Sequence, residues 1–180
     1  MTEAPTPFFD GHNDFLLRLM MTKAPREQVW LERNASGHLD LPRMREGGFA
    51  GGLFAIFVPP LSEEAPPDFA TLMLNPPYSL PEPQEITADA AQAPALRMAG
   101  LLHWMARAAP DDFTVCRSVA EIRAAMARGI IAGMMHMEGA EAIAPDLDAL
   151  YLFHAIGLRS LGPVWSRRTA FGHGAPMLFP

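Results

Sequence analysis

Two apolar runs constrain the fold of this chain more than any other feature. Gly52–Val58 (GLFAIFV) and Ile130–Met137 (IIAGMMHM) contain a single polar side chain between them, that of His136. Runs of this length and composition are typical of parallel strands that are covered on both faces. Pro7–Asp14 predicts a strand before them, and Arg159–Val164 predicts one after them. We therefore predict an α/β fold built on a parallel sheet.

Helical segments alternate with these strands. Asp40 is expected to cap one of them, and Ser118 and Glu121 form a capping box at the start of another, which Gly129 ends. Strands that alternate with helices indicate parallel βαβ units. The predicted helices are Leu41–Glu46, Leu96–Ala109, Ser118–Arg128 and Asp146–Ile156.

A proline-rich segment at about residues 59–94 interrupts the alternation, and only 69–74 within it has helical character. Loops of this length are uncommon inside a compact domain. We interpret the segment as an insertion within a single domain that spans residues 1–180, and not as a linker.

Composition excludes several classes of partner. The net charge is -6 and no basic stripe is present, so we expect no nucleic-acid partner. The single cysteine, Cys116, cannot form an internal disulfide bond. No apolar stretch approaches the ~20 residues of a membrane helix, and the N-terminus lacks the features of a signal peptide. We therefore expect no membrane contact and a cytoplasmic location.

Candidate metal ligands stand at the ends of two predicted strands. His12 and Asp14 flank Asn13, so a regular strand would direct both side chains to the same face. Glu138 follows the run Ile130–Met137 and would oppose them across the sheet. Imidazole and carboxylate groups are suitable ligands for zinc, and a carboxylate can bridge the two ions of a two-metal hydrolase.

Four segments together resemble the membrane (renal) dipeptidase family of zinc-dependent hydrolases. They are DGHND at 10–14, LPRMREGGFAGGLFAIFVP at 41–59, MEGAEAI at 137–143 and GLRSLGPVWSRRTAFGHG at 157–174. The resemblance implies a TIM-like (β/α)8 metallo-hydrolase barrel, of which this chain holds about the first four β/α units. We expect the proline-rich insertion to lie near the mouth of such a barrel.

The resemblance implies roles for three residues. His12 and Asp14 match the first metal-ligand pair of the family, and Glu138 matches the catalytic carboxylate that bridges two zinc ions. The implied activity is hydrolysis of the amide bond of a small dipeptide by a metal-activated water. The remaining ligands of the family belong beyond residue 180, so the ligand set for two zinc ions is incomplete here.

Four further residues are candidates for supporting the ligands or lining a substrate pocket. Asp10 is expected on the same strand face as His12, and His136 on the same face as Glu138, where each is either a support for a ligand or a core residue. Trp165 stands where animal members of the family have a substrate-contacting histidine, and it either shapes the pocket or packs. His173 lies in the FGHG segment and is a candidate for lining the site.

Half a barrel has two open sheet edges, which favour pairing with another chain. We therefore expect the chain to be a portion of a longer protein, and to associate with itself if it stands alone. Two alternatives to a dipeptidase remain open. One is a related hydrolase that acts on a lactone or a non-peptide amide, which the presence of Trp165 keeps open. The other is a catalytically inactive half-barrel that serves as a structural or interaction module.

Overall fold

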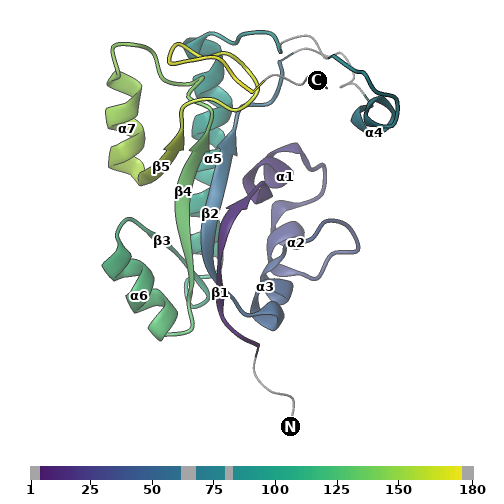
Figure 1. The fold of residues 1–180 in the computed structure, drawn as a ribbon. Coiled ribbons are helices and arrows are strands. Elements are labelled where there is room, and N and C mark those ends of the chain that lie inside the picture. The colour runs from purple at the N-terminus through teal and green to yellow at the C-terminus, as the bar shows by residue number, and fades with distance from the viewer. Residues whose placement is uncertain (1–4, 62–67, 80–82, 176–180) are drawn as a thin grey trace.

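Five parallel strands form a single sheet in the computed structural model, which describes residues 5–61, 68–79 and 83–175 (Figure 1). The strands are β1 (Phe8–Asn13), β2 (Phe49–Phe57), β3 (Phe113–Cys116), β4 (Ile131–Glu138) and β5 (Leu158–Gly162). The helices are α1 (Phe15–Met21), α2 (Arg26–Leu31), α3 (Leu41–Gly47), α4 (Phe69–Met73), α5 (Ala88–Ala108), α6 (Val119–Ala127) and α7 (Asp148–Ile156).

β4 is the centre of the sheet. One of its edges pairs with β2, from Gly51 opposite Ala132 to Phe57 opposite Glu138. Its other edge is shared, because β3 pairs with the first half of β4 and β5 pairs with the second half. β1 pairs with β2 at the far side of the sheet. The prediction of a parallel α/β fold is therefore confirmed, whereas the prediction of four strands was one strand short.

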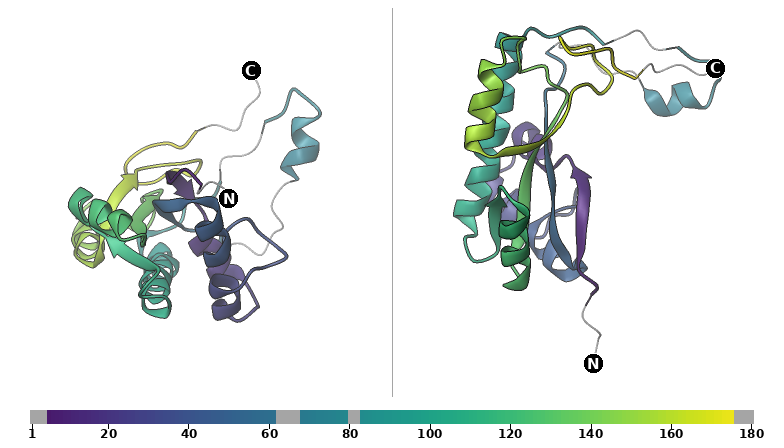
Figure 2. Two further views of the ribbon diagram at one scale, coloured as in Figure 1. Left: turned by 90° about the horizontal axis from the view of Figure 1, so that it is seen from below. Right: turned by 60° about the vertical axis from the view of Figure 1, so that its left-hand side comes forward.

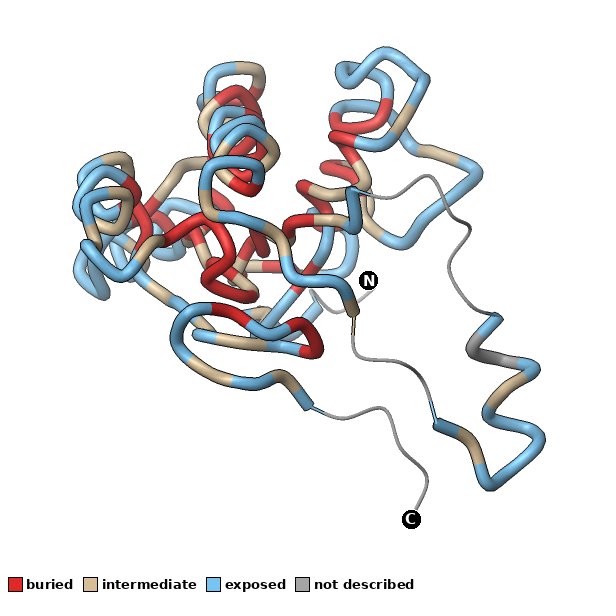
Figure 3. Tube along the Cα trace, turned by 90° about the horizontal axis from the view of Figure 1, so that it is seen from above, coloured by how far each residue is buried: buried red, intermediate tan, exposed pale blue. Residues whose placement is uncertain are grey.

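All the described helices except α4 gather on one side of the curved sheet, as both views of Figure 2 show, and α4 lies apart from this layer. Buried residues lie on the parts of the helices and strands that face each other, while the outer parts of the helices are exposed (Figure 3). The core contains Trp30, Phe54 and Phe113, whose rings pack edge to face at centroid distances of 5.4 and 5.2 Å. Trp30 also donates its indole N–H to the carbonyl of Met105, which satisfies the one polar atom of a fully buried side chain.

Two predicted helix starts are confirmed by their hydrogen bonds. The carboxylate of Asp40 accepts the backbone N–H of Arg43 at 2.9 Å and so caps α3. The hydroxyl of Ser118 accepts the backbone N–H of Glu121, whose own carboxylate accepts the N–H of Arg117. These bonds satisfy N–H groups that the first turn of a helix leaves without an intrahelical partner.

The segment between β2 and β3 differs from the sequence prediction. α5 begins at Ala88, eight residues before the predicted start of that helix, and it contains Pro94. Proline is normally excluded from a helix interior, but here the fully buried Ala91, Ala95 and Met98 pack that part of α5 against the core. α4 confirms the predicted helical stretch at 69–74. Parts of the 59–94 segment, residues 62–67 and 80–82, lie outside the described residues, and the single-domain assignment stays a prediction.

Two short helices, α1 and α2, lie between the first strand and α3 and were not predicted from the sequence. They bury Phe15, Leu16 and Trp30 against the sheet and α5. Among all the described helices, none is both long and apolar enough to cross a membrane.

Candidate metal centre

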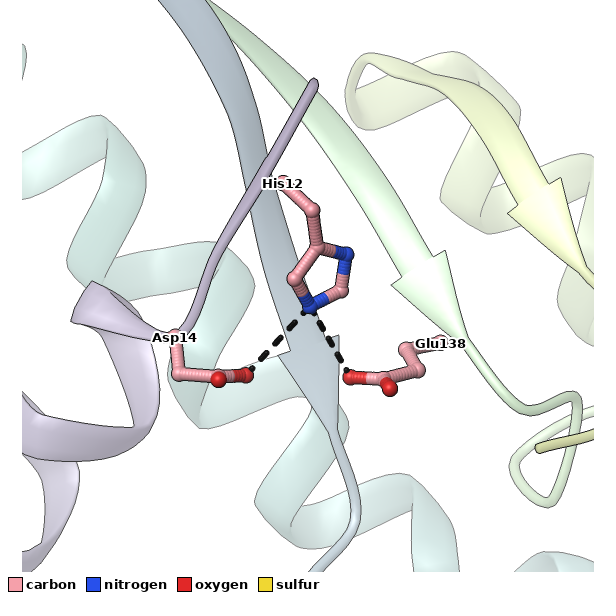
Figure 4. A group of neighbouring side chains, drawn as sticks. All are labelled: His12, Asp14 and Glu138. Atoms are coloured by element: carbon pink, nitrogen blue, oxygen red, sulfur yellow. Dashed lines mark ion pairs between the residues drawn. The ribbon is translucent and has the colours of Figure 1, made fainter. Parts of the chain in front are cut away.

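Three side chains, two from strands and one from the residue that follows β1, converge at one end of the sheet. His12 lies near the end of β1, Asp14 follows it as the N-cap residue of α1, and Glu138 is the last residue of β4. β1 and β4 both pair in parallel with β2, so their carboxyl ends lie at the same edge of the sheet. Figure 4 shows the imidazole of His12 directed between the two carboxylates.

The distances define a close group of donor atoms. Nε2 of His12 lies 3.6 Å from Oδ1 of Asp14 and 3.3 Å from Oε2 of Glu138. One donor atom from each residue lies within 4.8 Å of those of the other two, an arrangement that no other His, Cys, Asp or Glu group in the described ranges shows. The structure thus brings together the three residues that the sequence predicts as ligands.

The sequence predicted that strand alternation would direct His12 and Asp14 to the same face. The structure shows a different cause for their convergence. β1 ends at Asn13, its pairing with β2 shifts register between Asp10 and Asn13, and Asp14 has a non-extended backbone (φ -96°, ψ 28°). Asp14 occupies an N-cap position but its carboxylate makes no capping hydrogen bond. An aspartate there normally accepts an N–H of the first turn, so this carboxylate is left available to face His12.

Asn13 holds this turn in place, and sequence reasoning did not identify it. Its side-chain amide donates to the carboxylate of Asp10 at 2.9 Å and to the carbonyl of Leu53 at 3.2 Å. Its Oδ1 accepts the backbone N–H of Phe15 at 3.3 Å, which links the end of β1 to the start of α1. An asparagine between a strand and a helix is a signal for such a turn, because its side chain readily bonds the backbone two residues on.

The donor atoms and their spacing fit a divalent ion. Zinc binds imidazole nitrogen and carboxylate oxygen at about 2.0–2.2 Å, so two ligand atoms on a tetrahedral ion lie roughly 3.3–3.6 Å apart. The measured separations of 3.3 and 3.6 Å around His12 have this size. Three protein ligands also leave one tetrahedral position open, which is the arrangement of catalytic zinc sites.

The electrostatics of the group also favour a cation. Burial raises the pKa of the Glu138 carboxyl above its ordinary value, and the negative charges of Asp14 and Glu141 add to this effect. His12 acts in the opposite direction, as a hydrogen-bond donor and a nearby positive charge. Two carboxylates held this close repel each other when both are ionised. A bound cation would remove that repulsion.

His136, two residues before Glu138 on β4, packs beside the group. Its ring lies 5.5 Å from that of His12 in an edge-to-face contact, and its Nδ1 lies 2.8 Å from the hydroxyl of Ser160 on β5. Burial lowers the pKa of His136, and the neighbouring His12 lowers it further. A neutral, hydrogen-bonded ring in this position is suited to holding the orientation of His12.

The other three candidates lie around the group and not within it. Asp10 accepts the backbone N–H of His12 at 3.4 Å as well as the amide of Asn13, so it supports the turn. Trp165 lies in the loop after β5, 46% exposed, with its ring edge-on to that of Phe57 at 5.6 Å. His173 is an exposed residue further along the same loop.

A buried ion pair next to Glu138 was also missed by sequence reasoning. Nη1 of Arg167 lies 2.8 Å from Oε1 of Glu141 and donates to the carbonyl of Val58 at 3.0 Å. The two side chains are 5% and 4% exposed. The pair therefore ties the loop after β5 to the loop after β4 and to the end of β2. Charge alone gives no signal for such a pair, because most arginines and glutamates are exposed.

Comparison with known proteins decides the family. A family model described as membrane dipeptidase (peptidase family M19) matches residues 2–177. The chain belongs to the membrane dipeptidase family. The resemblance found in the four sequence segments is thereby confirmed.

Relatives of known sequence or structure extend well beyond this chain. An uncharacterized protein in the PQQ-III 3' region of Acinetobacter calcoaceticus is 37% identical over 175 residues, covering 97% of this chain and 53% of that protein. The solved structure of the dipeptidase AC, a metallo peptidase of this family, is 61% identical with a TM-score of 0.90, covering 99% of this chain and 49% of that one.

A second solved structure, a metallo peptidase from Rhodobacter sphaeroides, carries a phosphinate mimic of the dipeptide L-Ala-D-Ala. It is also 61% identical, with a TM-score of 0.91, and the match covers 98% of this chain and 50% of that one. The chain therefore spans about half the length of the relatives it matches. With its parallel sheet and one-sided helical layer, the fold is part of a TIM-like barrel.

Proposed function

We propose that this chain supplies metal ligands to the active site of a zinc-dependent dipeptidase that hydrolyses the amide bond of a small dipeptide. The observation that carries the proposal is the convergence of His12, Asp14 and Glu138 at the carboxyl edge of a parallel sheet. Barrel enzymes hold their catalytic groups at this edge. Membership of the membrane dipeptidase family and the dipeptide mimic bound to the Rhodobacter relative support the substrate class.

Each side chain has its own part in the proposal. His12, Asp14 and Glu138 donate one nitrogen and the carboxylate oxygens to the metal, with Glu138 as the catalytic carboxylate. When bound, the metal lowers the pKa of a water towards ~7 and polarises the scissile carbonyl. His136 holds the ring of His12, which keeps a ligand in place. The complete family site is expected to hold two zinc ions, and three ligands are enough for one.

Trp165 is proposed to form a wall of the substrate pocket. Its ring contacts that of Phe57 at the edge of the sheet where Glu138 lies, and nearly half of the Trp165 surface is exposed to solvent. A rigid aromatic side chain offers a large contact area at a small entropic cost. The exposed His173 in the same loop is a further candidate for contact with substrate.

The test is hydrolysis of L-Ala-D-Ala and L-Ala-L-Ala by the purified chain with added zinc, measured as the release of free alanine. We expect hydrolysis that stops on chelation and is lost in Glu138→Gln. Glu32→Gln, which changes an exposed glutamate in the same way, should leave it unchanged. Hydrolysis of lactones but not of dipeptides would favour the related-hydrolase alternative. Zinc binding without any hydrolysis would favour the inactive module, and either result contradicts the dipeptidase proposal.

We also propose that the chain associates with itself through β1. Within the described sheet β1 is an edge strand that pairs only with β2. Its Phe8 and Phe9 side chains are 48% and 39% exposed. An unpaired edge with exposed apolar side chains favours pairing with another chain. Size-exclusion chromatography with light scattering should show a dimer or larger species, and a well-behaved monomer would contradict this. That the chain is a portion of a longer protein stays a prediction.

A further inference from the structure

A cleft with three arginines lies in the helical layer, away from the metal centre. It has a volume of about 460 Å³ and is formed by the end of α1, the segment leading into α2, and one face of α5. This volume falls in the range of small-molecule sites, roughly 300–1,000 Å³. Its lining includes Leu19, Arg26, Arg97, Leu101, Trp104 and Arg107. None of the three proposed metal ligands lines it.

The charge of this arginine cleft is not neutralised by the chain itself. Arg26 has one acidic neighbour, Glu27, with 3.5 Å between Nε and Oε1. Within residues 5–61, 68–79 and 83–175, Arg97 and Arg107 form no ion pair or hydrogen bond through their side chains, although acidic residues outnumber basic ones by 20 to 14 in the whole chain. A guanidinium group without a carboxylate partner is available to an oxyanion, which it can bind through two parallel N–H bonds.

One of the three guanidinium groups is held in place before any ligand arrives. Cζ of Arg26 lies 4.4 Å from the centre of the Trp104 ring, and Trp104 is only 8% exposed, so this guanidinium rests on a rigid support. Arg97 and Arg107 both line the cleft and are ten residues apart on α5, which separates their backbones by about 15 Å along the helix axis. The charges therefore form two groups along α5: Arg26 on Trp104 with Arg107 about one turn further along the helix, and Arg97 two turns before Trp104.

Gly100 leaves the floor between these two groups open. It lies on α5 between Arg97 and Trp104, and a side chain added there would meet no atom within 4 Å. A ligand lying along α5 therefore reaches both groups of charge over a floor formed by Leu101 and the glycine backbone.

We propose that the arginine cleft binds a small multivalent oxyanion, a molecule with at least two phosphate or carboxylate groups. Two groups of charge at the ends of one cleft match an anion with more than one charged group. Three arginines around one small cleft do not form the long basic surface that nucleic acid requires. The site uses no residue of the metal centre and is independent of the dipeptidase proposal.

The experiment is isothermal titration of the purified chain with tripolyphosphate and, separately, with citrate, at about 0.1 M KCl to screen nonspecific attraction. We expect saturable binding of one anion per chain for at least one probe. Arg97→Gln and Arg107→Gln should each weaken it about tenfold, equivalent to roughly 1.4 kcal/mol. Gly100→Leu should abolish it by filling the floor. Whichever probe binds assigns the ligand to the phosphate or the carboxylate class.

Two matched variants control the experiment. Arg123→Gln removes the same charge from an exposed position on α6 and should leave binding unchanged. Gly100→Ala adds only a methyl group to the helix and should preserve most of the binding, while far-UV circular dichroism verifies the fold of every variant. The proposal is overturned if neither probe binds more tightly than about 1 mM, or if Arg123→Gln weakens binding as much as the cleft variants do. No zinc or dipeptide is present, so this result is separate from the test of hydrolysis.

Discussion

The buried pair of Arg167 and Glu141 gives the sharpest prediction about stability. Both side chains are at most 5% exposed, and the carboxylate depends on this one arginine, since Oε2 of Glu141 has no hydrogen-bond partner among the described residues. Arg167→Met therefore leaves a buried charge without a counter-ion. Breaking such a pair from one side costs about 3–5 kcal/mol of unfolding free energy. The lost bond to the carbonyl of Val58 contributes to the same loss.

Replacing both members should restore most of that loss. Arg167→Met combined with Glu141→Leu removes both desolvated charges and fills the space with apolar groups, which is often neutral for a buried pair. The coupling energy of the double-mutant cycle should therefore reach at least about 2 kcal/mol. The functional consequence is local, because the pair holds the loop that carries Trp165.

Urea unfolding followed by circular dichroism measures the cycle. With an m value of about 2 kcal/mol per molar urea, Arg167→Met should lower the midpoint by roughly 2 M, and the double variant should recover most of this shift. Arg33→Met, which breaks the exposed ion pair with Glu46, should leave the midpoint unchanged. Additive single effects in the double variant, or a shift no larger than that of Arg33→Met, would refute the reasoning.

Three further predictions concern single groups. Asp40→Ala removes a fully buried cap that accepts the N–H of Arg43, and should cost about 2–3 kcal/mol in urea unfolding; a loss near zero would contradict the capping role. Gly133→Ala places a methyl 2.3 Å from the buried ring of Phe113, and should cost about 1–3 kcal/mol by overpacking, so an unchanged midpoint would count against this packing. Burial raises the pKa of Glu138, and this side chain binds metal only as the carboxylate. Zinc affinity should therefore fall as the pH is lowered, and the fall should begin at a higher pH than protonation of an ordinary carboxyl would cause. Zinc affinity that stays constant in titrations from neutral to mildly acidic pH would contradict this.

The central strands and two helix starts could be predicted from the sequence because each has a strong local signal. The apolar runs of β2 and β4 predicted two central strands, and the capping residues Asp40 and Ser118 predicted two helix starts. β3 has only four residues and no apolar run of its own, so its pairing with β4 decides its structure. Tertiary contacts thus overrode a weak local signal there.

The candidate site was predictable in its members but not in its geometry. His12, Asp14 and Glu138 were identified because each stands near the end of a predicted strand, and the ends of parallel strands meet at one edge. The turn that directs Asp14 towards His12 depends on the hydrogen bonds of Asn13, which strand periodicity does not reveal. The Arg167–Glu141 pair joins residues 26 positions apart, and only the packed structure brings them together.

Zinc titration of the purified chain tests the central claim most directly. If His12, Asp14 and Glu138 hold a metal ion, calorimetry should show one zinc bound per chain, with binding lost in His12→Ala and in Glu138→Gln. His154→Ala, which removes an exposed histidine from α7, should bind zinc as the unchanged chain does. Zinc binding that survives both His12→Ala and Glu138→Gln, or no binding by the unchanged chain, would contradict the account.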